Sequence, residues 1–117
     1  MDLVDADVAP SRHNQVVLRA QKIARIGNRR VLLLSIMDRS ADELEVKSVR
    51  AWLGPAGAER ELPRPTYRLR AKTVPVNEEM AVAVSLPKPL ASSDRLRLRI
   101  EFTDPERSVE LAGIRVR

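Results

Sequence analysis

RLRLRIEF, residues 95–102, alternates charged and apolar side chains over its whole length. Successive side chains of a β-strand point to opposite faces, so a period of two predicts a strand with one buried and one solvated face. The inward set is Leu96, Leu98, Ile100 and Phe102. A strand of this kind belongs to an antiparallel sheet that covers a core on one side only.

Similar short apolar runs, bounded by turn residues, continue on both sides of this strand. Further strands are expected within 14–26, 31–37, 44–53, 66–74, 80–86 and 108–116, with a short extension at 60–62. The clearest turn between them is Gly-Pro-Ala-Gly at 54–57. About seven strands separated by frequent turns predict an all-β fold, an immunoglobulin-like sandwich of two antiparallel sheets.

Three positions in this pattern carry more detailed predictions. The run VLLLSIM at 31–37 is continuously apolar, which predicts a central strand covered on both faces. The period of the last strand slips between Leu111 and Ile114, around Gly113, and a β-bulge explains such a slip. Trp52, the single tryptophan, lies in a strand where immunoglobulin-type domains bury a Trp, so we expect it in the core.

The composition excludes several classes of protein. A chain of 117 residues is long enough for one domain with a core. Because there is no Cys, a disulfide scaffold, a thiolate zinc site and a cysteine nucleophile are excluded. Aromatic residues make up only 3% of the chain, which argues against a surface that stacks bases or sugars. No apolar run approaches the roughly 18–20 residues that span a bilayer.

The sequence contains no pattern typical of catalysis or of metal binding. His13 is the only imidazole, and it lies in a polar segment without an evident acid–base partner. Asp38, Asp42, Glu43 and Glu45 offer carboxylates, but without the spacing of a calcium loop. The chain has four glycines in all, too few for a phosphate cradle. We therefore expect no enzyme activity, no cofactor and no metal.

The net charge of +5 directs attention to two basic strand faces. Alternation places three cations on one side of each of two strands: Arg68, Arg70 and Lys72, and Arg95, Arg97 and Arg99. If the two strands are neighbours, all of these cations line one surface that suits an acidic protein or a polyanion, and they are the candidate partner-binding residues. The alternative is that these cations pair with Glu45, Glu101 and Glu110 across strands.

Three segments resemble bacterial immunoglobulin-like sandwich domains, including a myxobacterial family of unknown function. They are VLLLSIMDRSADELEVKSVRAWL at 31–53, AVAVSLPKPLASSDRLRLRIEF at 81–102 and RSVELAGIRVR at 107–117. The resemblance extends over residues 15–117. It implies a non-enzymatic interaction or structural domain, and it brings no catalytic residue to this chain.

The sequence thus predicts a flexible acidic lead-in at 1–13 and a single sandwich domain at 14–117. The lead-in lacks the basic and apolar segments of a signal peptide, which leaves open a cytoplasmic location or export after removal of a leader. The expected function is a protein-binding or structural module of a larger assembly. It would bind a protein partner, or a second copy, through a sheet face or an edge strand. The alternative is a β domain that binds nucleic acid or another polyanion.

Overall fold

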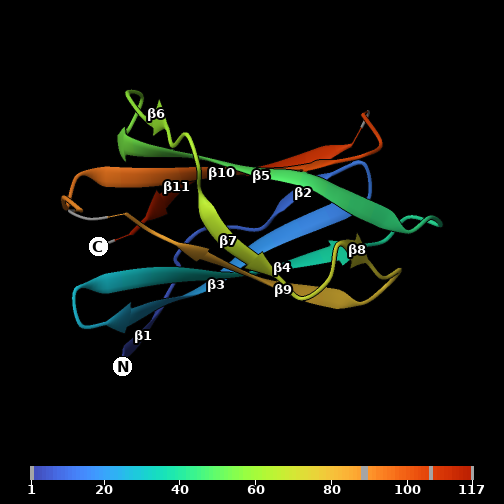
Figure 1. Ribbon diagram of the computed structural model, residues 1–117, viewed down its shortest axis with the longest axis horizontal. Helices are drawn as coiled ribbons and strands as arrows, with labels where there is room; N and C mark the ends of the chain where they lie inside the picture. The colour runs from blue at the N-terminus through green and yellow to red at the C-terminus, as the bar shows by residue number, and fades with distance from the viewer. Residues whose placement is uncertain (1, 88–89, 106, 117) are drawn as a thin grey trace.

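The computed structural model describes residues 2–87, 90–105 and 107–116 (Figure 1). These residues form eleven β-strands and no helix, so no helix in the described part of the chain could cross a membrane. The strands are β1 (Asp2–Asp5), β2 (Ser11–His13), β3 (Val16–Ile26), β4 (Arg29–Asp38), β5 (Leu44–Pro55), β6 (Arg60–Glu61), β7 (Thr66–Leu69), β8 (Thr73–Val74), β9 (Glu79–Ser85), β10 (Asp94–Phe102) and β11 (Ser108–Arg115).

The strands form two antiparallel sheets, which lie one above the other in Figure 1. The six-stranded β4 sheet has the order β1-β3-β4-β9-β7, and β2 also pairs with β3. The five-stranded β10 sheet has the order β11-β10-β5-β6, and β8 also pairs with β5. The predicted all-β, immunoglobulin-like sandwich of two antiparallel sheets is confirmed.

The core lies between the two sheets and uses the strand phase expected from the alternating pattern. Leu96, Leu98 and Ile100 of β10 are each 0% exposed, and Phe102 is 2% exposed. The opposite sheet contributes the inward residues of β3, β4 and β9 to the same cluster. Burying one such aliphatic side chain is worth about 1.5–3 kcal/mol, so this shared layer is the main source of stability.

Three strands, β3, β5 and β11, absorb an extra residue and keep their apolar side chains inward; in β5 the extra residue is Lys47. In β11, Leu111 pairs with Leu98 and Ile114 pairs with Leu96, so three steps along β11 match two along β10. Gly113 has a φ of 70°, a left-handed conformation that glycine adopts at little cost. The predicted bulge near Gly113 is confirmed. In β3 the extra residue is Gln21, which the sequence pattern did not reveal.

The first thirteen residues contain more structure than the predicted lead-in. β1 pairs with β3 from Asp2 to Asp5, and β2 pairs with β3 from Ser11 to His13. Ala6 between them is buried at 9% exposure and belongs to the core cluster. The sandwich therefore begins in the segment assigned to the lead-in, because β3 is long enough to pair with both strands along one edge.

β4 occupies the middle of its sheet, as the run VLLLSIM predicted, but only one of its faces is covered. Its inward residues Leu32 and Leu34 are almost fully buried. Its outward residues Val31, Leu33 and Met37 remain partly exposed. The prediction of cover on both faces is wrong for the described residues, because no second layer lies outside this sheet.

The turn after β4 is held by a buried pair of polar residues. Asp38 is 0% exposed and Ser40 is 3% exposed. Oδ1 of Asp38 accepts hydrogen bonds from the Ser40 backbone N–H at 2.8 Å and from the Ser40 hydroxyl at 2.6 Å. A side chain that satisfies nearby backbone donors in this way fixes the course of a tight loop.

Candidate interaction surfaces

The six candidate cations do not form one surface. Arg95, Arg97 and Arg99 lie on β10, in the interior of its sheet. Arg68 lies on β7, at the edge of the opposite sheet, with Arg70 just after that strand. Because β7 pairs with β9 and β10 pairs with β5 and β11, the two basic strands are not neighbours. Whether either group binds a partner stays a prediction.

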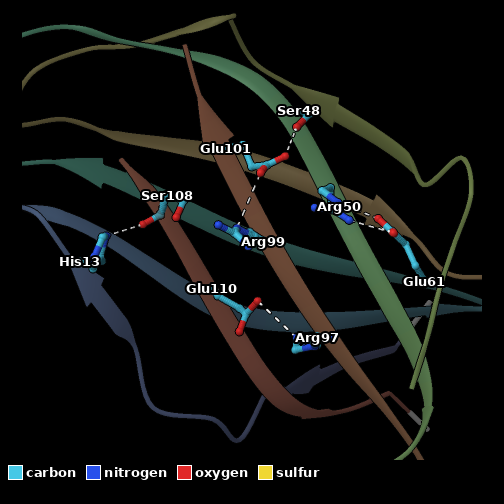
Figure 2. A network of polar contacts seen from close by, with 9 residues as sticks. All are labelled: His13, Ser48, Arg50, Glu61, Arg97, Arg99, Glu101, Ser108 and Glu110. Atoms are coloured by element: carbon cyan, nitrogen blue, oxygen red, sulfur yellow. Dashed lines mark hydrogen bonds and ion pairs between the residues drawn. The ribbon is translucent and has the colours of Figure 1, made fainter. Parts of the chain in front are cut away.

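Two of the three cations of β10, Arg97 and Arg99, face carboxylates on the outer face of their sheet (Figure 2), whereas Arg95 donates to the backbone carbonyl oxygens of Ser92 and Asp94. Arg97 lies 3.7 Å from Glu110 of β11, and Arg99 lies 3.8 Å from Glu101 on its own strand. Glu101 also accepts a hydrogen bond of 2.8 Å from the Ser48 hydroxyl. Such pairs on an exposed sheet contribute little stability each, but they leave few free positive charges for a polyanion.

Lys72 follows the same pattern at the other end of the sheet. Its Nζ lies 4.0 Å from a carboxylate oxygen of Glu45. All three carboxylates named by the alternative interpretation, those of Glu45, Glu101 and Glu110, therefore hold a cation.

Arg50 and Glu61 form the best-aligned ion pair of this face (Figure 2). Arg50 Nε donates to Glu61 Oε2 at 2.7 Å, and Arg50 Nη2 donates to Oε1 at 2.9 Å. This two-point contact joins β5 to the short strand β6 and fits the planar guanidinium. The hydrogen bond from Arg50 is the main reason why the pKa of Glu61 lies below its ordinary value. The same bond raises the pKa of Arg50.

Trp52 lies on this charged outer face, and the expectation that it belongs to the core is wrong. It is partly exposed and stands outside the buried cluster. The guanidinium carbons of Arg97 and Arg50 lie over its ring, 4.2 Å and 4.9 Å from the centroid. Two guanidinium groups, instead of core residues, thus cover the ring, and these cation–π contacts hold the three side chains against one another.

His13 connects the two sheets at one side of the sandwich. Its Nδ1 lies 2.8 Å from the backbone carbonyl oxygen of Ser108 on β11 (Figure 2). The side chain is exposed, and an open depression next to it is lined by Arg12, Arg99 and Glu110 as well. The imidazole nitrogen that faces the protein is hydrogen-bonded to a main-chain oxygen, so this contact links β2 of one sheet to β11 of the other.

The outer face of the β4 sheet differs from that of the β10 sheet. The strand registers place one row of directly paired residues across five strands: Asp5, Lys22, Leu33, Ala83 and Arg68. Paired residues of an antiparallel sheet project from the same face. The row is therefore charged at both ends and apolar in its middle.

Neighbouring rows extend the apolar middle along β4 and β9. We call this surface the apolar band, and it consists of Val31, Leu33, Met37, Ala81 and Ala83, with the polar but buried Ser35 between Leu33 and Met37. None of the five apolar residues belongs to the core cluster, and all five are partly or fully exposed.

The margins of the apolar band carry an excess of positive charge. On the β3 side, Lys22 pairs with Asp5, and Arg19 lies 3.9 Å from Glu79. On the β7 side, neither Arg68 nor Arg70 pairs with a carboxylate of the described residues. Within the predicted basic set, Arg68, Arg70 and Arg95 thus have no carboxylate partner among the described residues, and of these three Arg68 and Arg70 border the apolar band.

Two of the strand edges, those of β7 and β11, are less open than the apolar band. β7 has only four residues, follows Pro65 and carries Arg68. Short length, proline and charge are the features with which proteins block pairing at sheet edges. β11 is longer, but β2 and β3 of the other sheet lie close to it and His13 contacts one of its carbonyl groups. A sheet face is therefore better suited than either of these two edges.

No metal-binding arrangement accompanies these surfaces in the part of the chain that the structure describes. No three His, Cys, Asp or Glu side chains are grouped there in a way that could hold a metal ion. The apolar band itself was missed by the sequence analysis. Its signal was the uninterrupted run at 31–37, which was interpreted as a doubly buried strand.

Comparisons with known proteins identify the fold and not a family. No protein-family model matches the chain, and no curated protein matches it. Among solved structures, it is similar to the archaellum periplasmic stator protein FlaG from Sulfolobus acidocaldarius, with a TM-score of 0.59 at 11% identity over 81% of this chain and 96% of that one.

A second solved structure, the stator protein complex of FlaF and FlaG from the same organism, matches with a TM-score of 0.60 at 11% identity over 86% of this chain and 90% of that one. At this identity the likeness shows a shared sandwich fold. The finer resemblance to bacterial and myxobacterial domains gains no support from these comparisons.

Proposed function

We propose that this chain is a non-enzymatic structural module that binds a protein partner, within a larger assembly, through the outer face of its β4 sheet. The observation that carries the proposal is the apolar band, in which Val, Leu and Met side chains, with one buried serine among them, lie on the outward side of a central strand. The band needs a cover that the described residues do not supply.

The two outer faces of the sandwich support this proposal by their contrast. An antiparallel sheet that covers a core on one side normally turns polar residues to water on the other. The β10 sheet follows this rule with its Arg and Glu pairs. The β4 sheet does not, and contiguous apolar surface on a folded protein is typical of interaction sites.

The fold likeness supports the same class of function. The matching structures are named as stator proteins, and one of them is named as a complex of two such proteins. We extend to this chain only the general role of a structural part in an assembly. The identity of the partner is not carried over, since the likeness concerns the fold.

The apparent mass of the complex that contains this chain in its native cell tests the proposal. A tagged copy of the chain is cross-linked in cells with formaldehyde, and the extract is separated by size exclusion. We expect the tagged chain to elute at a mass well above the 13.1 kDa of a single copy. Elution only as a single copy, with a cross-linked control complex detected in the same extract, would contradict the proposal.

A further inference from the structure

A shallow hollow interrupts the apolar band between β4, β9 and β7. It has a volume of about 370 Å³. Ala81 and Ala83 form its floor, because their small side chains leave space between Leu33 on β4 and Arg68 on β7. This volume lies at the lower end of the range of ligand sites, and it suits one apolar side chain better than a whole ligand.

The rim of the hollow is positively charged. Arg68 and Arg70 both line it, and neither has a carboxylate partner among the described residues. A guanidinium group binds a carboxylate through two parallel hydrogen bonds, which makes arginine well suited to acidic surfaces. A partner that places an apolar side chain in the hollow brings its flanking residues next to both arginines.

A second copy of this chain fits the hollow poorly. The carboxylates of Asp5 and Glu79 along the margins of the apolar band already face a cation of their own chain, and the exposed Glu78 beside Glu79 lines a depression together with the chain's own Arg70. In a face-to-face dimer, Arg68 and Arg70 would therefore meet mostly cations, or carboxylates that already lie near a cation of their own chain. Like charges across an interface oppose association.

A lipid surface is a weaker candidate than a protein. The residues of the apolar band lie in the plane of a sheet, between neighbouring side chains, and Leu33 and Ala83 are only partly exposed. Insertion into a bilayer is favoured by apolar side chains that enter the acyl region. A flat, hollowed face is better matched by a second protein surface.

We infer that the hollow over Ala81 and Ala83 receives an apolar side chain of a protein partner whose neighbouring residues are acidic and pair with Arg68 and Arg70. This inference rests on the proposed function and adds the chemistry of the partner to it. It also separates the candidate cations into two groups, because Arg68 and Arg70 contact the partner and the arginines of β10 do not.

Two designed peptides test the inference by NMR spectroscopy. The ¹⁵N-labelled chain is titrated with an end-blocked peptide of four Leu-Glu repeats and with one of four Leu-Lys repeats. We expect the Leu-Glu peptide to shift amide signals of β4, β7 and β9 and to leave β5 and β10 unchanged. Equal shifts with the Leu-Lys peptide, shifts confined to the β10 sheet, or no shift up to about 1 mM peptide would overturn the inference.

Charge-reversal variants locate the contact. Arg68→Glu combined with Arg70→Glu is expected to weaken binding of the Leu-Glu peptide by about tenfold or more. Ala83→Trp, which fills the hollow, is expected to weaken it as well. Arg97→Glu on the opposite sheet serves as the matched control and should leave the affinity unchanged. Circular dichroism checks that each variant is folded.

Two further measurements test the other two occupants considered for the hollow, a second copy of this chain and a lipid surface. Sedimentation of the free chain that showed a dimer sensitive to Arg68→Glu would assign the face to a second copy and overturn the inference. Binding to phosphatidylcholine–phosphatidylglycerol vesicles through β4 and β9, without binding of the Leu-Glu peptide, would do the same.

The inference and the proposed function fail in different ways. If the native assembly survives the double variant at Arg68 and Arg70 but is lost with Leu33→Asp in the apolar band, the inference is wrong and the proposed function stands. If no assembly forms around the unaltered chain, the proposed function is wrong.

Discussion

The guanidinium carbon of Arg97 lies 4.2 Å from the centroid of the Trp52 ring, directly across from it on the neighbouring strand. Arg97→Met keeps the aliphatic stem over the ring and removes the charge. We expect the free energy of unfolding to fall by about 0.5–1 kcal/mol, the usual value of an exposed cation–π contact. Urea unfolding followed by the fluorescence of Trp52, the single tryptophan, measures the change. An equal loss in Arg115→Met, an exposed arginine of β11, would argue against a specific contribution of the ring.

Adjacent residues of β10 should respond in opposite ways to a new charge. Leu98 is fully buried, so Leu98→Arg places an unpaired charge in the core and is expected to unfold the domain. Arg97→Glu lies on the solvated face and should leave the fold intact, although it weakens the contact with Glu110. Circular dichroism distinguishes the two variants. A folded Leu98→Arg together with an unfolded Arg97→Glu would show that the assigned strand phase is reversed.

The Arg50–Glu61 pair predicts how stability depends on acid. Since the pKa of Glu61 is lowered in the folded state, the pair contributes stability above the ordinary carboxyl pKa of 4.5. That contribution is lost as the pH falls from about 4.5 through the lower folded pKa. We expect Glu61→Gln to reduce stability at pH 7 and to flatten its decline below pH 4.5. Urea unfolding across pH 2.5–7 measures this, with the exposed Glu78→Gln as a control whose profile should match the unaltered chain.

The buried turn after β4 should depend on the Ser40 hydroxyl. Ser40→Ala removes one donor to the Asp38 carboxylate, whose Oδ2 has no hydrogen-bond partner among the described residues. We expect a loss of about 1–3 kcal/mol, because a buried acceptor is left less satisfied. The exposed Ser93→Ala is the matched control, with an expected change within about 0.5 kcal/mol. Similar melting temperatures for both variants would contradict this role of Ser40.

Nucleic-acid binding, the alternative function, is expected to be weak. Arg97 and Arg99 face carboxylates of their own sheet, so few free cations remain on that surface. Filter binding with mixed DNA and RNA at about 50 mM and about 200 mM salt tests this, because binding to phosphates weakens steeply as salt rises. We expect no retention at either concentration. Retention at low salt that Arg97→Glu abolishes would support a polyanion-binding surface on the β10 sheet.

The fold could be predicted from the sequence where side chains alternate regularly. Residues 95–102 match β10 almost to the residue, and the slip around Gly113 is a real bulge. The bulge at Gln21 was missed, because Ala20 and Ala24 are small and weaken the apolar signal in β3. Local alternation thus predicts strands well, and it becomes ambiguous where alanine replaces larger apolar residues.

The interaction surface could not be predicted from the sequence, because it depends on pairing between distant strands. Arg68 and Arg97 look equivalent in the sequence, but only the topology shows that Arg97 has Glu110 of β11 beside it and Arg68 has no carboxylate among the described residues. A continuous apolar run predicts burial on both faces, yet it cannot reveal whether the second cover belongs to the same chain. Leu33 remains partly exposed, so no residue in the part of the chain that the structure describes fully covers its outward side.

The bulge at Gln21 has a consequence for how the length of this chain can vary. Val16, Leu18 and Ala20 point inward before it and Ile23 points inward after it, so removal of Gln21 would restore a regular alternation without inverting either half of β3. Removal of Arg19 would instead shift part of the strand out of phase with its neighbours. Homologues with single-residue deletions in this strand are therefore expected to have lost the residue at Gln21.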